Sequence, residues 1–134
     1  MRRLSFLQVE LSDLHGFSGL TFEQYQTDRH TRREVERLVE NLANACLDIA
    51  KIILAGENLE IPSTYSLVFV RLSEAGIIPP TLARDLAALA RTRNVLAHQY
   101  LDIKWEQLRH FLQHGPRLLT RFVKIVEKRL EEST

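Results

Sequence analysis

The sequence predicts an all-α protein, an up-down antiparallel bundle of four to five helices in a single domain over residues 1–134. Two observations support this expectation. Apolar residues recur at helical spacing through several long segments, and no segment alternates convincingly as a strand, although the short run 67–70 is ambiguous. The chain is 45% hydrophobic and 26% charged, which at 134 residues is typical of a globular protein that buries its own core.

The first helix is expected over residues 3–14, where leucines recur every three or four positions. Gly16 and Gly19 interrupt this pattern. A short turn is expected at 21–26, and Thr21 is a plausible N-cap for it.

The second helix has the clearest pattern. Thr31 and Glu34 have the spacing of a capping box, and Gly56 supplies a stop. Cys46 lies on the apolar stripe of this helix and is interpreted as a core residue rather than a reactive thiol. It is the only cysteine, so no intrachain disulfide is possible, and a reducing, cytoplasmic location is expected. The stripe consists of Val35, Leu38, Val39, Leu42, Cys46, Ile49 and Ile53.

Prolines and glycines delimit the next two helices. The third is expected to begin near Ser63 and to end at Gly76. Pro79 and Pro80 forbid helix before them and suit the first turn after them, so the fourth helix is expected over residues 81–98.

The fifth helix is expected after Asp102, which is a good N-cap candidate. Its apolar stripe continues as far as Leu130. However, Pro116 cannot donate a hydrogen bond to the carbonyl of Leu112, so a kink or break is expected at Gly115-Pro116.

Polar residues on this fifth helix suggest two further sites, and we assign neither. His110 and His114 lie one turn apart, with Glu106 one turn earlier, but no further metal ligand is evident and a solvated face is favoured. A basic stripe has the spacing to follow an RNA backbone, although a solvated surface explains it equally well. The stripe consists of Arg117, Arg121, Lys124 and Lys128.

The fourth helix contains the main anomaly, because Arg93 falls in the middle of its apolar stripe. A guanidinium stays charged and is costly to bury, so Arg93 is predicted to meet a carboxylate, a cleft or a second subunit. A structural ion pair with a buried acid is the simpler alternative. Arg91, Asn94 and His98 share an adjoining face, with Asn94 and His98 one turn apart. The apolar stripe consists of Leu82, Leu86, Leu89, Leu96 and Ala97.

This polar cluster has the groups needed to cleave RNA. Histidine exchanges a proton near neutral pH, so His98 suits acid–base chemistry. Arg93 can clamp a phosphate, and Asn94 can orient the imidazole or the phosphate. Attack by a ribose 2′-hydroxyl on the adjacent phosphorus then needs proton transfer and charge stabilisation. One histidine per chain is few for this chemistry, and a dimer would supply a second. The alternative for His98 is a helix-end residue that caps carbonyls.

Residues 93–100, RNVLAHQY, match the signature of the HEPN family, in which Arg is followed after four residues by His, any residue and Tyr. Three further segments and the final helix resemble the HepT-like ribonuclease toxins of that family. The segments are LTFE at 20–23, ACLDIA at 45–50 and AGIIP at 75–79. The resemblance covers nearly the whole chain, and the sequence is identified on these segments as similar to HepT.

The resemblance implies an all-α homodimer in which the Arg/His sets of both copies face one shared cleft. It implies a metal-independent endoribonuclease toxin of a bacterial or archaeal toxin–antitoxin system, with Arg93 and His98 as catalytic residues and Asn94 in support. It further implies a minimal nucleotidyltransferase as cognate antitoxin, which adenylylates the motif tyrosine, here Tyr100. A second interpretation of Tyr100 is a core aromatic residue with its hydroxyl at the surface, which is compatible with the modification.

The sequence departs from the commoner family pattern, in which Ile-Asp follows two residues after the tyrosine. Here Lys104 follows Ile103, and the nearby acid is Asp102, so the chain does not match the family's downstream acid, although it keeps the Arg, His and Tyr of the motif.

The expected partners are an RNA substrate, a second copy of the chain and the antitoxin, with no DNA and no cofactor or metal. The net charge of +1 means that RNA binding must come from a local patch. Neither a signal peptide nor a membrane span is expected, because polar residues interrupt every apolar run. The alternative function is a non-catalytic HEPN module that binds a nucleotide or a protein.

Overall fold

The computed structural model describes residues 2–132, and these residues form six α-helices and one 3-10 helix, with no strand among them. The all-α prediction is confirmed. The ambiguous run at 67–70 lies within α4. The elements are α1 (Arg2–Leu14), η1 (His15–Phe17), α2 (Phe22–Thr27), α3 (Arg29–Gly56), α4 (Tyr65–Glu74), α5 (Pro80–His98) and α6 (Leu101–Glu132).

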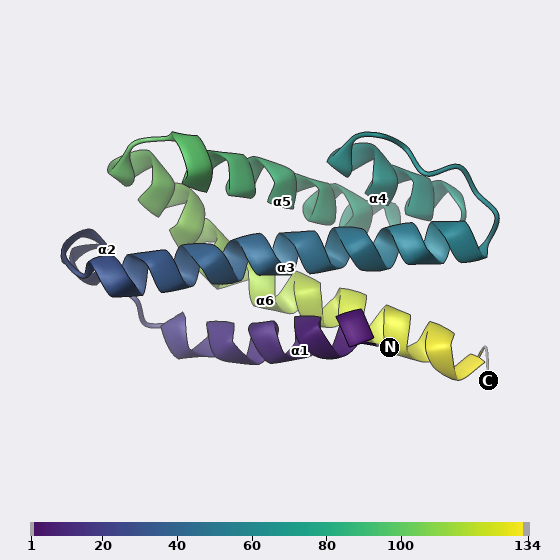
Figure 1. The fold of residues 1–134 in the computed structure, drawn as a ribbon, viewed down its shortest axis with the longest axis horizontal. Helices are drawn as coiled ribbons and strands as arrows, with labels where there is room; N and C mark the ends of the chain where they lie inside the picture. Colours follow the sequence, from purple (N-terminus) through teal and green to yellow (C-terminus); the bar gives the residue numbers. More distant parts are fainter. Residues whose placement is uncertain (1, 133–134) are drawn as a thin grey trace.

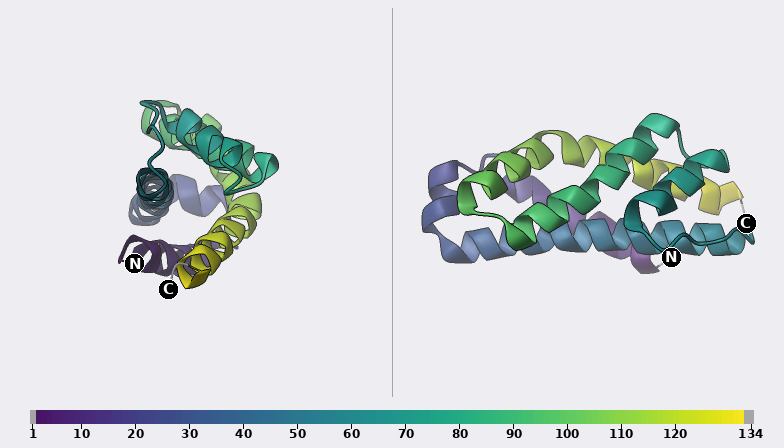
Figure 2. Two further views of the ribbon diagram at one scale, coloured as in Figure 1. Left: turned by 90° about the vertical axis from the view of Figure 1, so that its right-hand side faces the viewer. Right: turned by 90° about the horizontal axis from the view of Figure 1, so that it is seen from above.

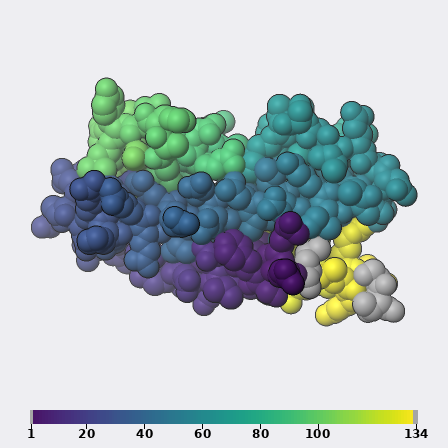
Figure 3. Space-filling view, in the orientation of Figure 1, coloured from purple at the N-terminus to yellow at the C-terminus, as the bar shows by residue number. Residues whose placement is uncertain are grey.

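The long helix α3 runs the length of the molecule, with α1 along one side and α4 and α5 along the other (Figure 1). Helix α6 contacts α5, α1 and α2, and it passes behind α3 towards the end where both termini lie (Figures 1 and 2). In the space-filling view, α3 forms a band that separates the surface of α1 from the surface of α4 and α5 (Figure 3). Helix α5 is therefore held between α4, α3 and α6.

One hydrophobic core joins the helices, and its largest fully buried side chains include Tyr25, Phe69 and Phe122. The rings of Phe69 and Phe122 meet edge to face, with centroids 6.4 Å apart. Cys46 is completely buried in this core, and burial raises the pKa of its thiol. The interpretation of Cys46 as a core residue is confirmed, because a buried thiol stays protonated and unreactive.

Two helix starts differ from the prediction. The capping box expected at Thr31 and Glu34 is wrong, because Asp28 caps α3 by accepting hydrogen bonds from the amides of His30 and Thr31. The carboxylate of Asp28 takes these free amides, so the helix begins at Arg29. A capping box instead joins Thr21 and Gln24, which makes the expected turn at 21–26 a short helix, α2, with Thr21 as its confirmed N-cap.

Helix α6 also differs from the prediction at two points. Asp102 is not its N-cap, because the helix begins at Leu101 and Asp102 lies in its first turn. Of the kink or break expected at Gly115-Pro116, the break is absent, since α6 continues through Pro116 as one helix. Gly115 is buried against the ring of Phe111, and Leu119 is buried one turn later, so packing on both sides of Pro116 offsets the missing hydrogen bond.

Among residues 2–132, no helix is both long and apolar enough to cross a membrane.

Candidate active site at the end of helix α5

Helix α5 presents its last turns to solvent while its apolar side holds it in the core. Leu82, Leu86, Leu89 and Leu96 are buried as expected, but Ala97 is exposed, contrary to its predicted place on the core side. The helix ends at His98, because the backbone of Gln99 is extended (φ −98°, ψ 170°), and its N–H donates to the carbonyl of Val95 at 3.0 Å.

Arg93 is half-buried and is held by two neutral groups. Its Nη1 donates a hydrogen bond to Oδ1 of Asn44 at 2.8 Å, and its Cζ lies 5.2 Å from the centroid of the Tyr65 ring. Burial raises the pKa of Tyr65, so its hydroxyl remains a donor and bonds to the carbonyl of Ala43 at 3.1 Å. The alternative of a structural ion pair is wrong, since Arg93 pairs with no carboxylate in the part of the chain described. The positive charge is positioned without being neutralised.

Two grooves meet at the end of α5. The α4–α5 groove, of about 970 Å³, is lined by Arg91, Asn94 and His98 together with small and apolar residues of both helices. The α3–α5 groove, of about 620 Å³, is lined by Arg93 and Asn94 with charged residues of α3. Asn94 lines both grooves, whereas Arg93 and His98 open into different ones, as expected of residues about 140° apart around a helix.

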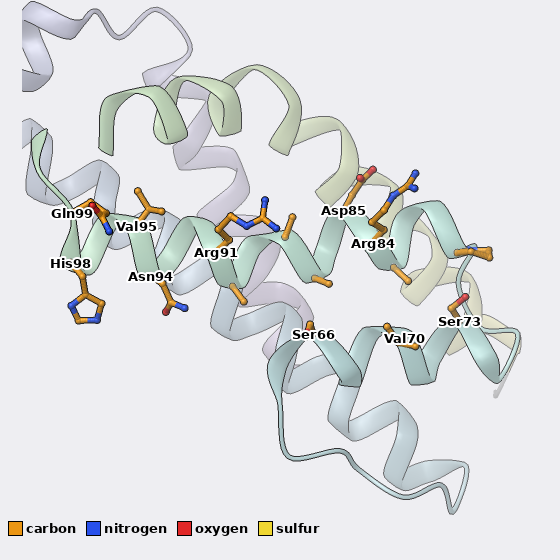
Figure 4. A pocket seen from close by; sticks show the side chains of 15 residues that line it. Ser66, Val70, Ser73, Arg84, Asp85, Arg91, Asn94, Val95, His98 and Gln99 are labelled. Atoms are coloured by element: carbon orange, nitrogen blue, oxygen red, sulfur yellow. The ribbon is translucent and has the colours of Figure 1, made fainter. Parts of the chain in front are cut away.

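Asn94 and His98 leave the same side of α5 (Figure 4). Arg91 lines the α4–α5 groove as well, so the predicted shared face of Arg91, Asn94 and His98 is confirmed. The guanidinium of Arg91, however, extends in the opposite direction to the other two side chains (Figure 4). His98 is exposed, and its side chain makes no hydrogen bond with residues 2–132. It therefore caps no carbonyl among them, and its imidazole is available to a ligand.

Tyr100 lies in the two-residue link between α5 and α6, and 82% of its surface is exposed. The alternative of a core aromatic is therefore wrong for this chain. Only Gln99 separates Tyr100 from His98 in the sequence, so a group attached to its hydroxyl would lie close to the imidazole.

The residues of α3 and α4 that contact Arg93 were not predicted from the sequence. These residues are Asn44 and Tyr65. Asn44 carried a weak signal, because it is a single amide among the buried residues Leu42, Ala43, Ala45 and Cys46. A polar group on such a face needs a partner, but its sequence position does not show which one.

Of the two acidic residues that line the α3–α5 groove with Arg93, Glu36 and Glu40, the first already has partners. Glu36 accepts a hydrogen bond from the hydroxyl of Tyr25 and forms an ion pair with Lys104 at 3.7 Å. Lys104 stands where the commoner family pattern has an acid, so here that position serves to hold α6 against α3. Asp102 is exposed on the outer side of the first turn of α6.

The residues considered for metal binding do not assemble a ligand set. The rings of His110 and His114 are 4.5 Å apart, but Glu106 pairs with Arg109 at 3.1 Å. No group of three histidine, cysteine, aspartate or glutamate side chains suited to a metal ion occurs between residues 2 and 132.

Known proteins resemble this chain in sequence. The tRNA nuclease HepT of Aphanizomenon flos-aquae is 28% identical over 106 residues, which cover 79% of this chain and 72% of the relative. The mRNA nuclease HepT of Shewanella oneidensis is 24% identical over 104 residues, or 78% of each chain.

Solved structures share the fold. A tri-AMPylated HEPN toxin of Shewanella oneidensis, in complex with an MNT antitoxin, matches with a TM-score of 0.84 over 95% of both chains, at 20% identity. The cytosolic protein YutE of Bacillus subtilis, of unknown function, matches with a TM-score of 0.79 over 98% of this chain and 88% of its own, also at 20% identity. The family model described as "Ribonuclease HepT-like" matches residues 7–126. Since this match covers most of the chain, the protein belongs to the HepT-like ribonuclease family.

Proposed function

We propose that the chain is a metal-independent endoribonuclease toxin that cleaves RNA with Arg93 and His98, supported by Asn94, when two copies form one cleft. The proposal rests on how the last two turns of α5 arrange their polar side chains. They present a positioned, unneutralised guanidinium and an exposed imidazole on either side of Asn94. Membership of a ribonuclease family and relatives named as tRNA and mRNA nucleases support it.

The chemistry is transfer of a phosphoryl group within the RNA strand. One imidazole takes the proton of a ribose 2′-hydroxyl as the bond from that oxygen to phosphorus forms. The bond from phosphorus to the 5′-oxygen breaks, and an imidazolium returns a proton to the leaving oxygen. The guanidinium of Arg93 stabilises the negative charge that develops on the phosphate oxygens. The products are a 2′,3′-cyclic phosphate and a 5′-hydroxyl.

A second copy of the chain completes this scheme. One copy offers a phosphate at the end of α5 a single imidazole, because His98 is the only histidine that lines the α4–α5 groove. The α4–α5 groove has walls of small residues, Ala83, Ala87 and Ala90, and Val70 on its rim is 41% exposed. Pairing of two α5 helices along this face would bury apolar surface and bring two Asn94/His98 sets into one cleft.

We further propose that a cognate minimal nucleotidyltransferase neutralises the toxin by adenylylating Tyr100. The phenolic oxygen attacks the α-phosphorus of ATP, pyrophosphate leaves and the phenolic proton is lost. The 82% exposure of Tyr100 makes it accessible, and each added phosphate puts negative charge beside the catalytic groups. The solved HEPN toxin that is tri-AMPylated and complexed with an MNT antitoxin supports this route. The proposed setting is a bacterial or archaeal cytoplasm, where RNA is the substrate.

The test compares the wild-type chain with His98→Ala and Arg93→Ala on bulk cellular RNA in the presence of EDTA. Both variants are expected to remain folded and dimeric, as judged by circular dichroism and sedimentation, and to lose cleavage. The matched control is His15→Ala, because His15 is exposed and lines neither groove. A His98→Ala variant that cuts RNA at the wild-type rate, or a chain that is monomeric and active, would overturn the proposal.

A further inference from the structure

A third groove, of about 510 Å³, lies between α5 and α6, outside the candidate active site. We call it the α5–α6 groove. Its charged lining comes from both helices. Helix α5 supplies Arg91 and Asp85, and helix α6 supplies Arg117 and Arg121. His110 and His114, whose rings are 4.5 Å apart, line it as well.

The groove carries an excess of unpaired positive charge. Three arginines face one carboxylate, which leaves two positive charges even when both histidines are neutral. None of the three arginines forms an ion pair with residues 2–132, and all three are exposed. Arginine forks match the oxygens of a phosphate, and imidazole N–H groups add further donors. The lining therefore fits phosphate oxygens.

The α5–α6 groove adjoins the candidate active site across helix α5. Asp85, Ala88 and Arg91 line both this groove and the α4–α5 groove that contains His98. In Figure 4 the guanidinium of Arg91 extends in the opposite direction to the side chains of Asn94 and His98. The seven residues from Arg91 to His98 correspond to about 10 Å along the helix axis. A strand lying at His98 therefore reaches the second groove by crossing α5 at Arg91.

We propose that the α5–α6 groove binds backbone phosphates of the RNA strand on one side of the cleaved bond. The inference rests on the proposed ribonuclease function and adds to it the place where the flanking strand is held. His110 and Arg121 are eleven residues apart, or about 16 Å along α6, so the lining is extended enough to contact more than one phosphate. Backbone contacts of this kind set affinity and register without reading sequence.

The test measures binding rather than cleavage. A fluorescently labelled twelve-nucleotide oligouridylate is titrated with the His98→Ala dimer over a series of salt concentrations. The double change Arg117→Gln and Arg121→Gln is expected to weaken binding and to lower the slope of log affinity against log salt by about 1.4, at ~0.7 per lost phosphate contact. The matched control is Lys124→Gln with Lys128→Gln, on the same helix but outside the groove lining. The control is expected to change the slope much less.

A second variant tests the proposal through a gain in binding, which loss of folding would not produce. Asp85 is the one carboxylate in the lining, so Asp85→Asn is expected to tighten oligouridylate binding by about two- to fivefold at low salt. Unchanged or weaker binding by Asp85→Asn, or an equal effect of the lysine control, would overturn the proposal. So would a double arginine variant that keeps its RNA affinity but loses the antitoxin complex, because the groove would then bind a protein.

The proposed ribonuclease function and the proposed phosphate-binding groove can each be disproved without the other. If the chain binds oligouridylate through this groove but the wild type cleaves no RNA, the proposed function is wrong while phosphate binding stands. If the wild type and the arginine variant cleave a long RNA with the same KM and kcat, the groove proposal is wrong while the ribonuclease stands.

Discussion

Arg93 and Asn44 form a hydrogen bond of 2.8 Å between Nη1 and Oδ1, which joins the C-terminal part of α5 to the middle of α3. The partner is an amide rather than a carboxylate, so the bond fixes the direction of the guanidinium and leaves its charge intact. A charge held in place before substrate arrives is more effective than one that must reorganise. Asn44 is therefore a positioning residue for the proposed reaction.

Asn44→Ala is expected to reduce RNA cleavage by between about tenfold and a hundredfold, because a displaced catalytic group costs rate without being removed. The free energy of unfolding, measured in urea, should fall by only about 1 kcal/mol. Asn41→Ala is the matched control, since Asn41 lies on the same helix and donates to Glu10 at 3.0 Å instead. Equal loss of activity in the two variants would mean that the bond to Arg93 has no special role.

Two substitutions of Tyr65 distinguish the role of its ring beneath Arg93 from the role of its hydroxyl. Tyr65→Phe keeps the ring beneath the guanidinium but removes the hydrogen bond to the carbonyl of Ala43, so cleavage should persist while stability falls by about 1 kcal/mol. Tyr65→Leu removes the ring, and a lost cation–π contact of about 0.5–2 kcal/mol should lower kcat/KM by roughly two- to thirtyfold. Steady-state cleavage and urea unfolding of both variants give the comparison. Loss of activity in Tyr65→Phe would contradict it.

The helices were predictable because their signals are local. Leucine spacing, the glycine at 56 and the prolines at 79 and 80 each act within a turn or two of their own position, and the helices predicted from them were found. The errors occurred where several local signals compete. Asp28 and Thr31 are both good N-cap residues, and only the structure shows that Asp28 takes the free amides.

The site was predictable only in part. Helical geometry was enough to place Asn94 and His98 on one face, and the structure confirms this. The partners of Arg93 were not predictable, since Asn44 lies 49 residues away in sequence and meets it only through the packing of α3 on α5. Likewise, the meeting of Arg91 with Arg117 and Arg121 depends on how α5 crosses α6, which no periodicity within one helix specifies.

Tyr100→Phe distinguishes modification from catalysis. The ring is 82% exposed and makes no contact that the fold needs, so the variant should keep its stability and its RNA cleavage. It should no longer gain AMP mass when incubated with the nucleotidyltransferase and ATP, as measured by intact-protein mass spectrometry. The matched control is Tyr25→Phe, which should still be modified because Tyr25 is buried and is not the acceptor. AMP addition to Tyr100→Phe would move the modification to another residue.

The buried phenol of Tyr25 is expected to make the folded chain less stable at alkaline pH. Burial, and then its hydrogen bond to Glu36, raise the pKa of Tyr25, so the folded chain favours the protonated phenol. The resulting stability is fully present below the unfolded pKa of about 10 and declines as pH rises above it. Urea unfolding between pH 8 and pH 11 should show a decline that is shallower in Tyr25→Phe. Identical pH profiles would mean that other groups cause the decline.

Gly115→Ala tests the close packing of Gly115 against Phe111, next to the point where α6 continues past Pro116. A Cβ at this position would lie 2.6 Å from the ring of Phe111, which is itself buried and cannot move freely. The strain of about 1–3 kcal/mol should exceed the gain of about 1 kcal/mol that alanine brings to a helix interior, so the variant should be less stable. Gly56→Ala is the matched control, because nothing lies within 4 Å of its Cβ position and it should be neutral or slightly stabilising. If both variants were stabilised in thermal and urea unfolding, the close contact with Phe111 would not constrain this helix, and Gly115 would be replaceable.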